Sequence, residues 1–272
     1  MDTRTPGLRG RIPGQLVAVP HLNNYRTTAH TFSVSYPVDV TAGIVDWKML
    51  GNGPDGTLTA NGGNPVGDCT FAGREHYRMA KAAAGKLAET WETSDELVTE
   101  YLDYNNGQDV GANISQLLLN WYQDGKILGF AKLDPSDKQE VDWGVQTFHG
   151  VYCGVSLTAD ADELFAQHLP WTTANGERPN LMEGHCIVKV GGTPSQDTYV
   201  TWGALQNATV GWTSACLEEA YVVITEEDAK AASLDIDQLR QDLNLLLDAH
   251  GATVPATGCL KKIASWFSKV IG

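Results

Sequence analysis

A loop that ends in a cysteine at the start of a long helix constrains this chain more than any other stretch. The run Asn64-Pro65-Val66-Gly67-Asp68-Cys69 closes a glycine-rich segment, and the residues from Thr70 to about Ala88 are rich in helix formers and lack proline. A thiol in a first helical turn lies beside unpaired backbone N–H groups at the positive end of the helix dipole. That position lowers a thiol pKa and can hold an oxyanion, so we interpret Cys69 as a candidate nucleophile. A buried structural cysteine after an Asp68 N-cap is the alternative.

The composition indicates an acidic globular protein. Hydrophobic residues make up 42% of the 272 positions, and the formal net charge is −14. No basic stripe is available to meet phosphates, so we do not expect a nucleic-acid partner. No apolar run approaches the roughly 18 residues of a membrane-spanning helix, and no apolar signal-peptide core follows the N-terminal arginines. We therefore expect a cytoplasmic or virion-associated protein without a transmembrane segment.

The cysteines and histidines do not follow metal-binding patterns. Five dispersed cysteines contain no Cys-x-x-Cys pair, and no His-x-x-x-His motif occurs. Neither a disulfide framework nor a zinc site is expected, because both need regular spacing. We expect no metal and no cofactor, and a reducing compartment with at least one free thiol.

Local patterns predict helices early in the chain and strands later. Alternation over residues 31–40 indicates a strand or extended segment, which Pro37 would confine to a sheet edge. Apolar spacing and cap residues predict helices over 70–88, 94–104, 113–122, 137–149 and 160–168. Extended or strand segments are predicted over 126–130, 150–157, 185–190, 198–202 and 220–225. This order indicates an α+β chain with two lobes and a ligand site between them.

The chain divides into three parts. Residues 1–30 carry proline and glycine without a period and are expected to form an extended N-terminal arm. Residues 31–225 form the main domain, and residues 226–272 hold C-terminal helices and an amphipathic tail. The basic tail segment 260–271 is expected to dock on its own domain or on a partner, with contact to a membrane surface as the alternative.

A thiol nucleophile needs a base, which is usually histidine. His185 stands out among the seven histidines because it opens the apolar strand Cys186-Ile187-Val188-Lys189-Val190, which Gly191-Gly192 closes. A histidine at the mouth of a strand can meet a helix N-terminus from another lobe. We interpret His185 as the candidate base, with a hydrogen-bonded, partly buried histidine as the alternative. His76 shares the helix of Cys69 but lies two turns away, which is too far to touch the thiol.

These motifs, in this order, resemble the papain-like cysteine peptidases. The resemblance covers about residues 60–225 and rests on Gly67-Asp68-Cys69, on Gly184-His185 followed by an apolar strand, on Thr201-Trp202-Gly203, and on a closing strand at 219–224. The Cys-to-His separation of 116 residues is shorter than the roughly 130–150 expected for papain relatives. The residues of these motifs are also similar to those in papain-like proteins of actinobacteria and their phages.

The resemblance implies a role for each matching residue. Cys69 matches the nucleophile, His185 the general base, and Trp202 the indole that shields the histidine from water. Val200 stands where the family has its orienting Asn, so Thr201, or a residue from elsewhere in the chain, would have to orient the imidazole. Gly63 stands where the family has its oxyanion-hole Gln, and Asn64, or Asn61 by a longer reach, is the candidate substitute. The family's Trp after the nucleophile is absent as well.

The resemblance implies an α+β papain-like fold, a helical lobe followed by an antiparallel sheet, and thiol-dependent cleavage of an amide bond in a peptide or protein substrate. Two alternatives stay open. One is a phage or bacterial structural or binding protein that keeps the fold with weak or no activity. The other is a cell-wall amidase, although no wall-binding repeat is seen. A polar side chain at the far nitrogen of His185 favours an enzyme, whereas an apolar wall there favours a scaffold.

Overall fold

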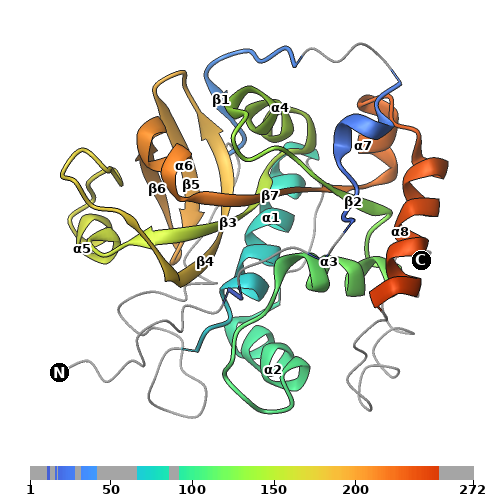
Figure 1. The fold of residues 1–272 in the computed structure, drawn as a ribbon, viewed down its shortest axis with the longest axis horizontal. Helices are drawn as coiled ribbons and strands as arrows, with labels where there is room; N and C mark the ends of the chain where they lie inside the picture. The colour runs from blue at the N-terminus through green and yellow to red at the C-terminus, as the bar shows by residue number, and fades with distance from the viewer. Residues whose placement is uncertain are drawn as a thin grey trace.

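The computed structural model describes residues 11–12, 16, 18–27, 32–41, 66–85 and 92–250. Most of the glycine-rich segment before Cys69 and the whole tail segment 260–271 lie outside these residues. Figure 1 shows one central sheet with helices packed around it, and α2 and α3 on one side of the molecule.

The sheet is antiparallel and its strands run in the order β2-β7-β3-β4-β5-β6, with the short β1 paired to β4. This arrangement confirms the predicted α+β class. Within the described residues 32–40 of the segment predicted over 31–40, the strand is limited to Val38–Asp39, beside Gly191 and Gly192. The strands are β1 (Val38–Asp39), β2 (Gly129–Lys132), β3 (Val151–Thr158), β4 (Pro179–Gly192), β5 (Gln196–Thr201), β6 (Ala204–Thr209) and β7 (Leu217–Ile224).

The helices begin where cap residues indicate. Thr93 caps α2 and forms a capping box with Glu96, and the side chain of Asn113 accepts the N–H of Gln116 at the start of α3. The helices are η1 (Leu22–Tyr25), α1 (Cys69–Gly85), α2 (Ser94–Tyr104), α3 (Ile114–Gln123), α4 (Lys138–Phe148), α5 (Ala161–Ala166), α6 (Val210–Cys216), α7 (Glu226–Ala231) and α8 (Ile236–His250).

Helices α1 and α4 cover opposite faces of the sheet. A Cβ added to Gly73 of α1 would lie 2.8 Å from the ring of Tyr152, whereas one added to Gly144 of α4 would lie 3.0 Å from Val151. Val151 and Tyr152 are consecutive residues of β3, so their side chains point to opposite faces. Close approach at Gly73 brings the first turns of α1 directly against β3 and β4.

Parts of the N-terminal thirty residues pack onto the body of the protein. The side chains of Leu22 and Tyr25 are buried and face the same side of η1, a short 3-10 helix within the segment expected to be extended. The Tyr25 hydroxyl donates to Asp242 of α8, and Arg11 lies buried beside β3. The C-terminal helix α8 thus closes over the same corner as η1.

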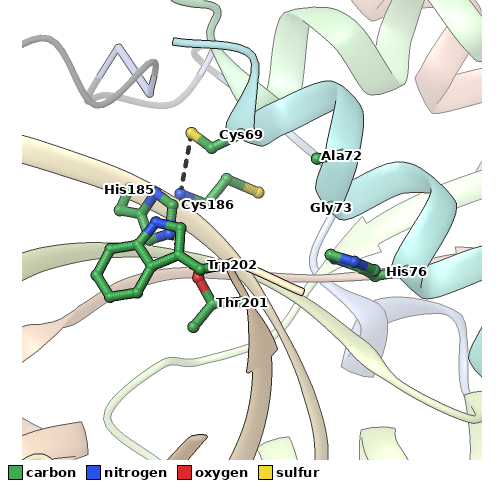
Figure 2. Close-up of a pocket in the computed structure, with 8 residues that line it drawn as sticks. All are labelled: Cys69, Ala72, Gly73, His76, His185, Cys186, Thr201 and Trp202. Atoms are coloured by element: carbon green, nitrogen blue, oxygen red, sulfur yellow. Dashed lines mark hydrogen bonds between the residues drawn. The ribbon is translucent and has the colours of Figure 1, made fainter. Parts of the chain in front are cut away.

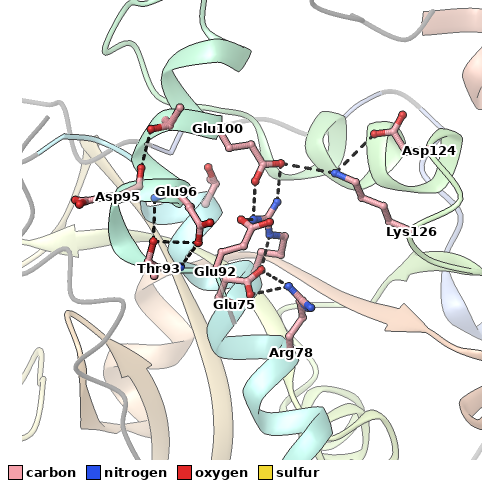
Figure 3. A network of polar contacts seen from close by, with 12 residues as sticks. Glu75, Arg78, Glu92, Thr93, Asp95, Glu96, Glu100, Asp124 and Lys126 are labelled. Carbon is pink, nitrogen blue, oxygen red and sulfur yellow. Dashed lines mark hydrogen bonds and ion pairs between the residues drawn. The ribbon is translucent and has the colours of Figure 1, made fainter. Parts of the chain in front are cut away.

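An ion-pair network fixes the start of α1 relative to α2 and the end of α3. The guanidinium of Arg74 pairs with Glu75, Glu92 and Glu100. Figure 3 shows these carboxylates converging between the helices, with Lys126 reaching Glu100 from the far side. The neighbouring carboxylates outweigh the effect of burial, so the pKa of Arg74 is raised and it stays charged.

A second network is buried under the other face of the sheet. The ammonium of Lys189 on β4 is fully buried and lies 2.5 Å from Asp142 of α4 and 2.7 Å from Asp197 of β5. Lys138 reaches the same two carboxylates from the protein surface, with 22% of its side chain exposed. The two cations balance the two carboxylates, which is the condition for burying them.

We expect Lys189→Met to lower the free energy of unfolding by about 3–5 kcal/mol, because two buried carboxylates lose a shared cation. Urea unfolding followed by circular dichroism measures this loss. Lys138→Met is the matched control, since its partly exposed ammonium is screened by water and its loss should be clearly smaller. A loss below about 1 kcal/mol for Lys189→Met would contradict the structural role of this network.

Candidate active site

Cys69 is the first residue of α1, as the loop-to-helix sequence predicts. The main-chain carbonyl of Asp68 accepts the N–H groups of Phe71 and Ala72, which sets the first helical turn. Cys69 and Asp68 are both buried: Cys69 is only 2% exposed and Asp68 is fully covered. The thiol therefore lies inside the interface between α1 and the sheet.

His185 lies in the middle of β4, which already begins at Pro179, so the prediction that His185 opens this strand is wrong. Its ring is held from two sides. Its Nε2 lies 2.7 Å from the hydroxyl oxygen of Thr201 on the neighbouring strand β5. The indole of Trp202 stacks on the imidazole with ring centroids 5.0 Å apart. Trp202 and Gly203 both have positive φ and form the two-residue turn of the β5–β6 hairpin, which is the geometry of a tight hairpin turn. The turn thereby places the Trp202 indole against the imidazole ring of His185.

One small pocket collects these side chains. Figure 2 shows Cys69 on the first turn of α1 facing the middle of β4, where His185, Thr201 and Trp202 gather. The link between the two elements is a hydrogen bond of 3.3 Å from the backbone N–H of Cys186 to the Cys69 sulfur. The pocket is lined by Cys69, Ala72, Gly73, His76, His185, Cys186, Thr201 and Trp202.

Some expected participants are placed by the structure and others are not. Thr201 and Trp202 both contact the His185 ring. Val200, at the position of the family's orienting Asn, is fully buried and pairs with Val188 of β4. Asn64 and Asn61, the expected oxyanion donors, lie outside the described residues, as does Gly63.

The electrostatic surroundings of Cys69 correct one expectation. Burial, aided by the charge of Asp68, raises the pKa of the Cys69 thiol to about 12, although the Cys186 N–H, Arg11 and the Thr70 N–H lower it. The helix start was expected to lower the pKa. Here the loss of hydration outweighs the helix N–H groups, so the sulfur is a neutral thiol near pH 7 in this arrangement.

Sequence reasoning did not single out Cys186 or Gly73 as residues of the pocket. Cys186 was read only as part of a strand, yet its N–H binds the Cys69 sulfur. Gly73 lies at the close contact between α1 and β4, since an added Cβ would lie 3.1 Å from the Cys186 sulfur. His76 is buried and also lines this pocket, two helical turns after Cys69 on α1.

Within the described residues, no group of three or more potential metal ligands comes together. No helix among them is long and apolar enough to cross a membrane.

No protein-family model and no curated protein matches this sequence. Among solved structures, the crystal structure of xylellain, a cysteine protease from Xylella fastidiosa, is similar, with a TM-score of 0.56 at 13% sequence identity. The match covers 83% of this chain and 98% of the xylellain chain. At this identity the likeness shows the fold, which is the papain-like arrangement of a helical lobe followed by an antiparallel sheet. The similarity to actinobacterial and phage proteins stays a prediction from the motifs.

We expect Asp68→Asn to speed alkylation of Cys69 by iodoacetamide about tenfold at pH 7.5. Removing the neighbouring negative charge lowers the pKa of the thiol, and one pKa unit is a factor of about ten in thiolate. The main-chain carbonyl that sets the helix start is unchanged by this substitution. Mass spectrometry of peptides measures the rate, with Cys153 of the same variant as internal control. An unchanged Cys69 rate would show that Asp68 does not govern this thiol.

Proposed function

We propose that this protein is a thiol-dependent hydrolase that cleaves an amide bond in a peptide or protein. Cys69 is the proposed nucleophile and His185 the proposed general base. The observation that carries the proposal is the Thr201 hydroxyl at 2.7 Å from His185 Nε2, in the pocket that also holds the Cys69 sulfur. A polar group at the far nitrogen of the histidine is what an enzyme of this kind needs and a scaffold does not.

The proposed chemistry has two halves. His185 Nδ1 takes the thiol proton as the Cys69 sulfur attacks the carbonyl carbon, and then returns that proton to the departing amine. A thioester with Cys69 remains. His185 next takes a proton from water, whose oxygen attacks the thioester carbon, and the thiol re-forms as the acid product leaves.

Thr201 and Trp202 support the base in this scheme. With Nε2–H donating to the Thr201 hydroxyl, Nδ1 is the basic nitrogen of the neutral ring. The stacked indole covers one face of the imidazole ring. The main-chain N–H of Cys69, one of the first in α1, is the proposed oxyanion donor, with Asn64 or Asn61 as the second.

A raised thiol pKa makes the base essential. A neutral thiol is a weak nucleophile, so proton removal has to accompany attack. The same observation favours the second candidate function, a structural or binding protein that keeps the papain-like fold with little activity. The two functions differ in whether removing His185 changes any measured rate.

We expect Cys69→Ala and His185→Ala each to reduce hydrolysis of a casein-derived fluorogenic peptide mixture at least a hundredfold. Unfolding curves of both variants check that the fold is kept. Cys153→Ala, which removes another buried thiol, is the control and should retain activity as long as it folds. Equal rates for the wild type and both site variants would favour the structural alternative.

For Thr201→Val we expect kcat to fall roughly tenfold to a hundredfold with little change in KM, because valine keeps the shape but cannot accept a hydrogen bond from the imidazole. Thr201→Ser keeps the hydroxyl and should restore most of the rate. Steady-state kinetics separate kcat from KM. A Thr201→Val enzyme as fast as Thr201→Ser would remove the hydroxyl from the proposed mechanism.

A further inference from the structure

Arg11 occupies a charged pocket close to the proposed reacting pair. Its side chain is fully covered, and its Nη2 lies 2.7 Å from a Glu218 oxygen. Its Nε donates to Glu219 at 3.1 Å and its Nη1 to the carbonyl oxygen of Val155 at 3.0 Å. All three nitrogens of the guanidinium are engaged, which is the recognition pattern of arginine rather than lysine.

The acceptors are fixed by the body of the protein and do not depend on Arg11 for their orientation. The Ser156 hydroxyl donates to Glu218 at 2.6 Å, and the Tyr221 hydroxyl donates to Glu219 at 2.8 Å. Ser156 belongs to β3, whereas Glu218, Glu219 and Tyr221 belong to β7. Two carboxylates face one guanidinium, so the pocket is negative in net charge, and 29% of the Glu218 side chain is open to solvent.

This pocket adjoins the proposed active site. Val155 is the register partner of His185 and Gly154 that of Cys186, whose N–H binds the Cys69 sulfur. The Arg11 Nε lies against Gly154, where an added Cβ would be only 2.5 Å away. The guanidinium of Arg11 therefore lies against the strand that neighbours His185 and Cys186, and its charge acts on the Cys69 thiol.

The backbone of residues 11–12 is held as an extended peptide would be. The N–H of Arg11 donates to the carbonyl of Gly184, next to His185, at 3.3 Å. The N–H of Ile12 donates to the carbonyl of Ala112, just before α3, at 2.8 Å. Gly184 has no side chain to obstruct this approach, since an added Cβ would lie 2.6 Å from the Arg11 carbonyl oxygen.

We propose that Glu218, Glu219 and the Val155 carbonyl form a specificity pocket for an arginine side chain of the substrate, filled here by the protein's own Arg11. The inference rests on the proposed function and names its substrate class: peptides that carry an arginine near the cleaved bond. The two carboxylates supply charge-assisted hydrogen bonds, the carbonyl supplies a third acceptor, and the two glycines leave room for the chain.

The test uses the full-length Arg11→Ala variant, which empties the pocket. Its substrates are peptides with one arginine scanned through the sequence, each paired with a peptide that has citrulline at that position. Citrulline keeps the shape of arginine without its charge. For the best arginine position, kcat/KM should exceed that of the citrulline partner at least tenfold. Adding Glu219→Gln should bring the ratio to within about twofold, whereas adding the exposed Glu226→Gln should leave it unchanged.

An active Arg11→Ala enzyme that does not distinguish arginine from citrulline at any position would overturn the inference. If no variant hydrolyses any peptide, the proposed function fails and the pocket is judged by binding alone. Agmatine, which carries a guanidinium, should then raise the melting temperature of Arg11→Ala at millimolar concentrations, whereas cadaverine, which carries only amines, should not. Equal effects of the two compounds would overturn the pocket itself. Arg11→Gln serves in the same assays if Arg11→Ala does not fold.

Discussion

The contact between the first turn of α1 and the middle of β4 determines where every reactive side chain lies. The hydrogen bond from the Cys186 N–H to the Cys69 sulfur joins the helical lobe to the sheet at this point. Gly73 permits the approach, because any side chain there would collide with Tyr152 and Cys186. Two residues more than a hundred positions apart in the chain come to share one pocket through this packing.

The same packing sets the chemistry of the thiol. Close burial removes water from Cys69, and the loss of hydration raises its pKa more than the neighbouring N–H groups lower it. A helix N-terminus is therefore not enough to activate a cysteine when the first turn is fully covered. In the proposed mechanism the imidazole of His185 removes the thiol proton during attack, and it is held by Thr201 and stacked on Trp202. The hairpin turn that carries Trp202 is thus part of the proposed site.

Much of this arrangement could be predicted from local sequence. The start of α1 at Cys69 follows from a turn-forming loop meeting a run of helix formers, and cap residues marked α2 and α3. The strand β6 and the helix α6 escaped prediction because Ala204–Thr209 has little apolar alternation and Val210–Cys216 is short and rich in poor helix formers. The burial of Arg11 could not be foreseen, since Glu218 and Glu219 meet it from more than 200 positions away. Long-range partners of this kind leave no periodic signal in a single sequence.

The central claim is that Cys69 and His185 act together on a carbonyl group. Rapid quenching of the first turnover, followed by peptide mass mapping, shows where the acyl group resides. The account predicts a thioester on Cys69 in the wild-type protein and its loss in His185→Ala. An acyl group that forms on Cys69 equally fast without His185, or that settles on Cys153 or Cys216 instead, would contradict it.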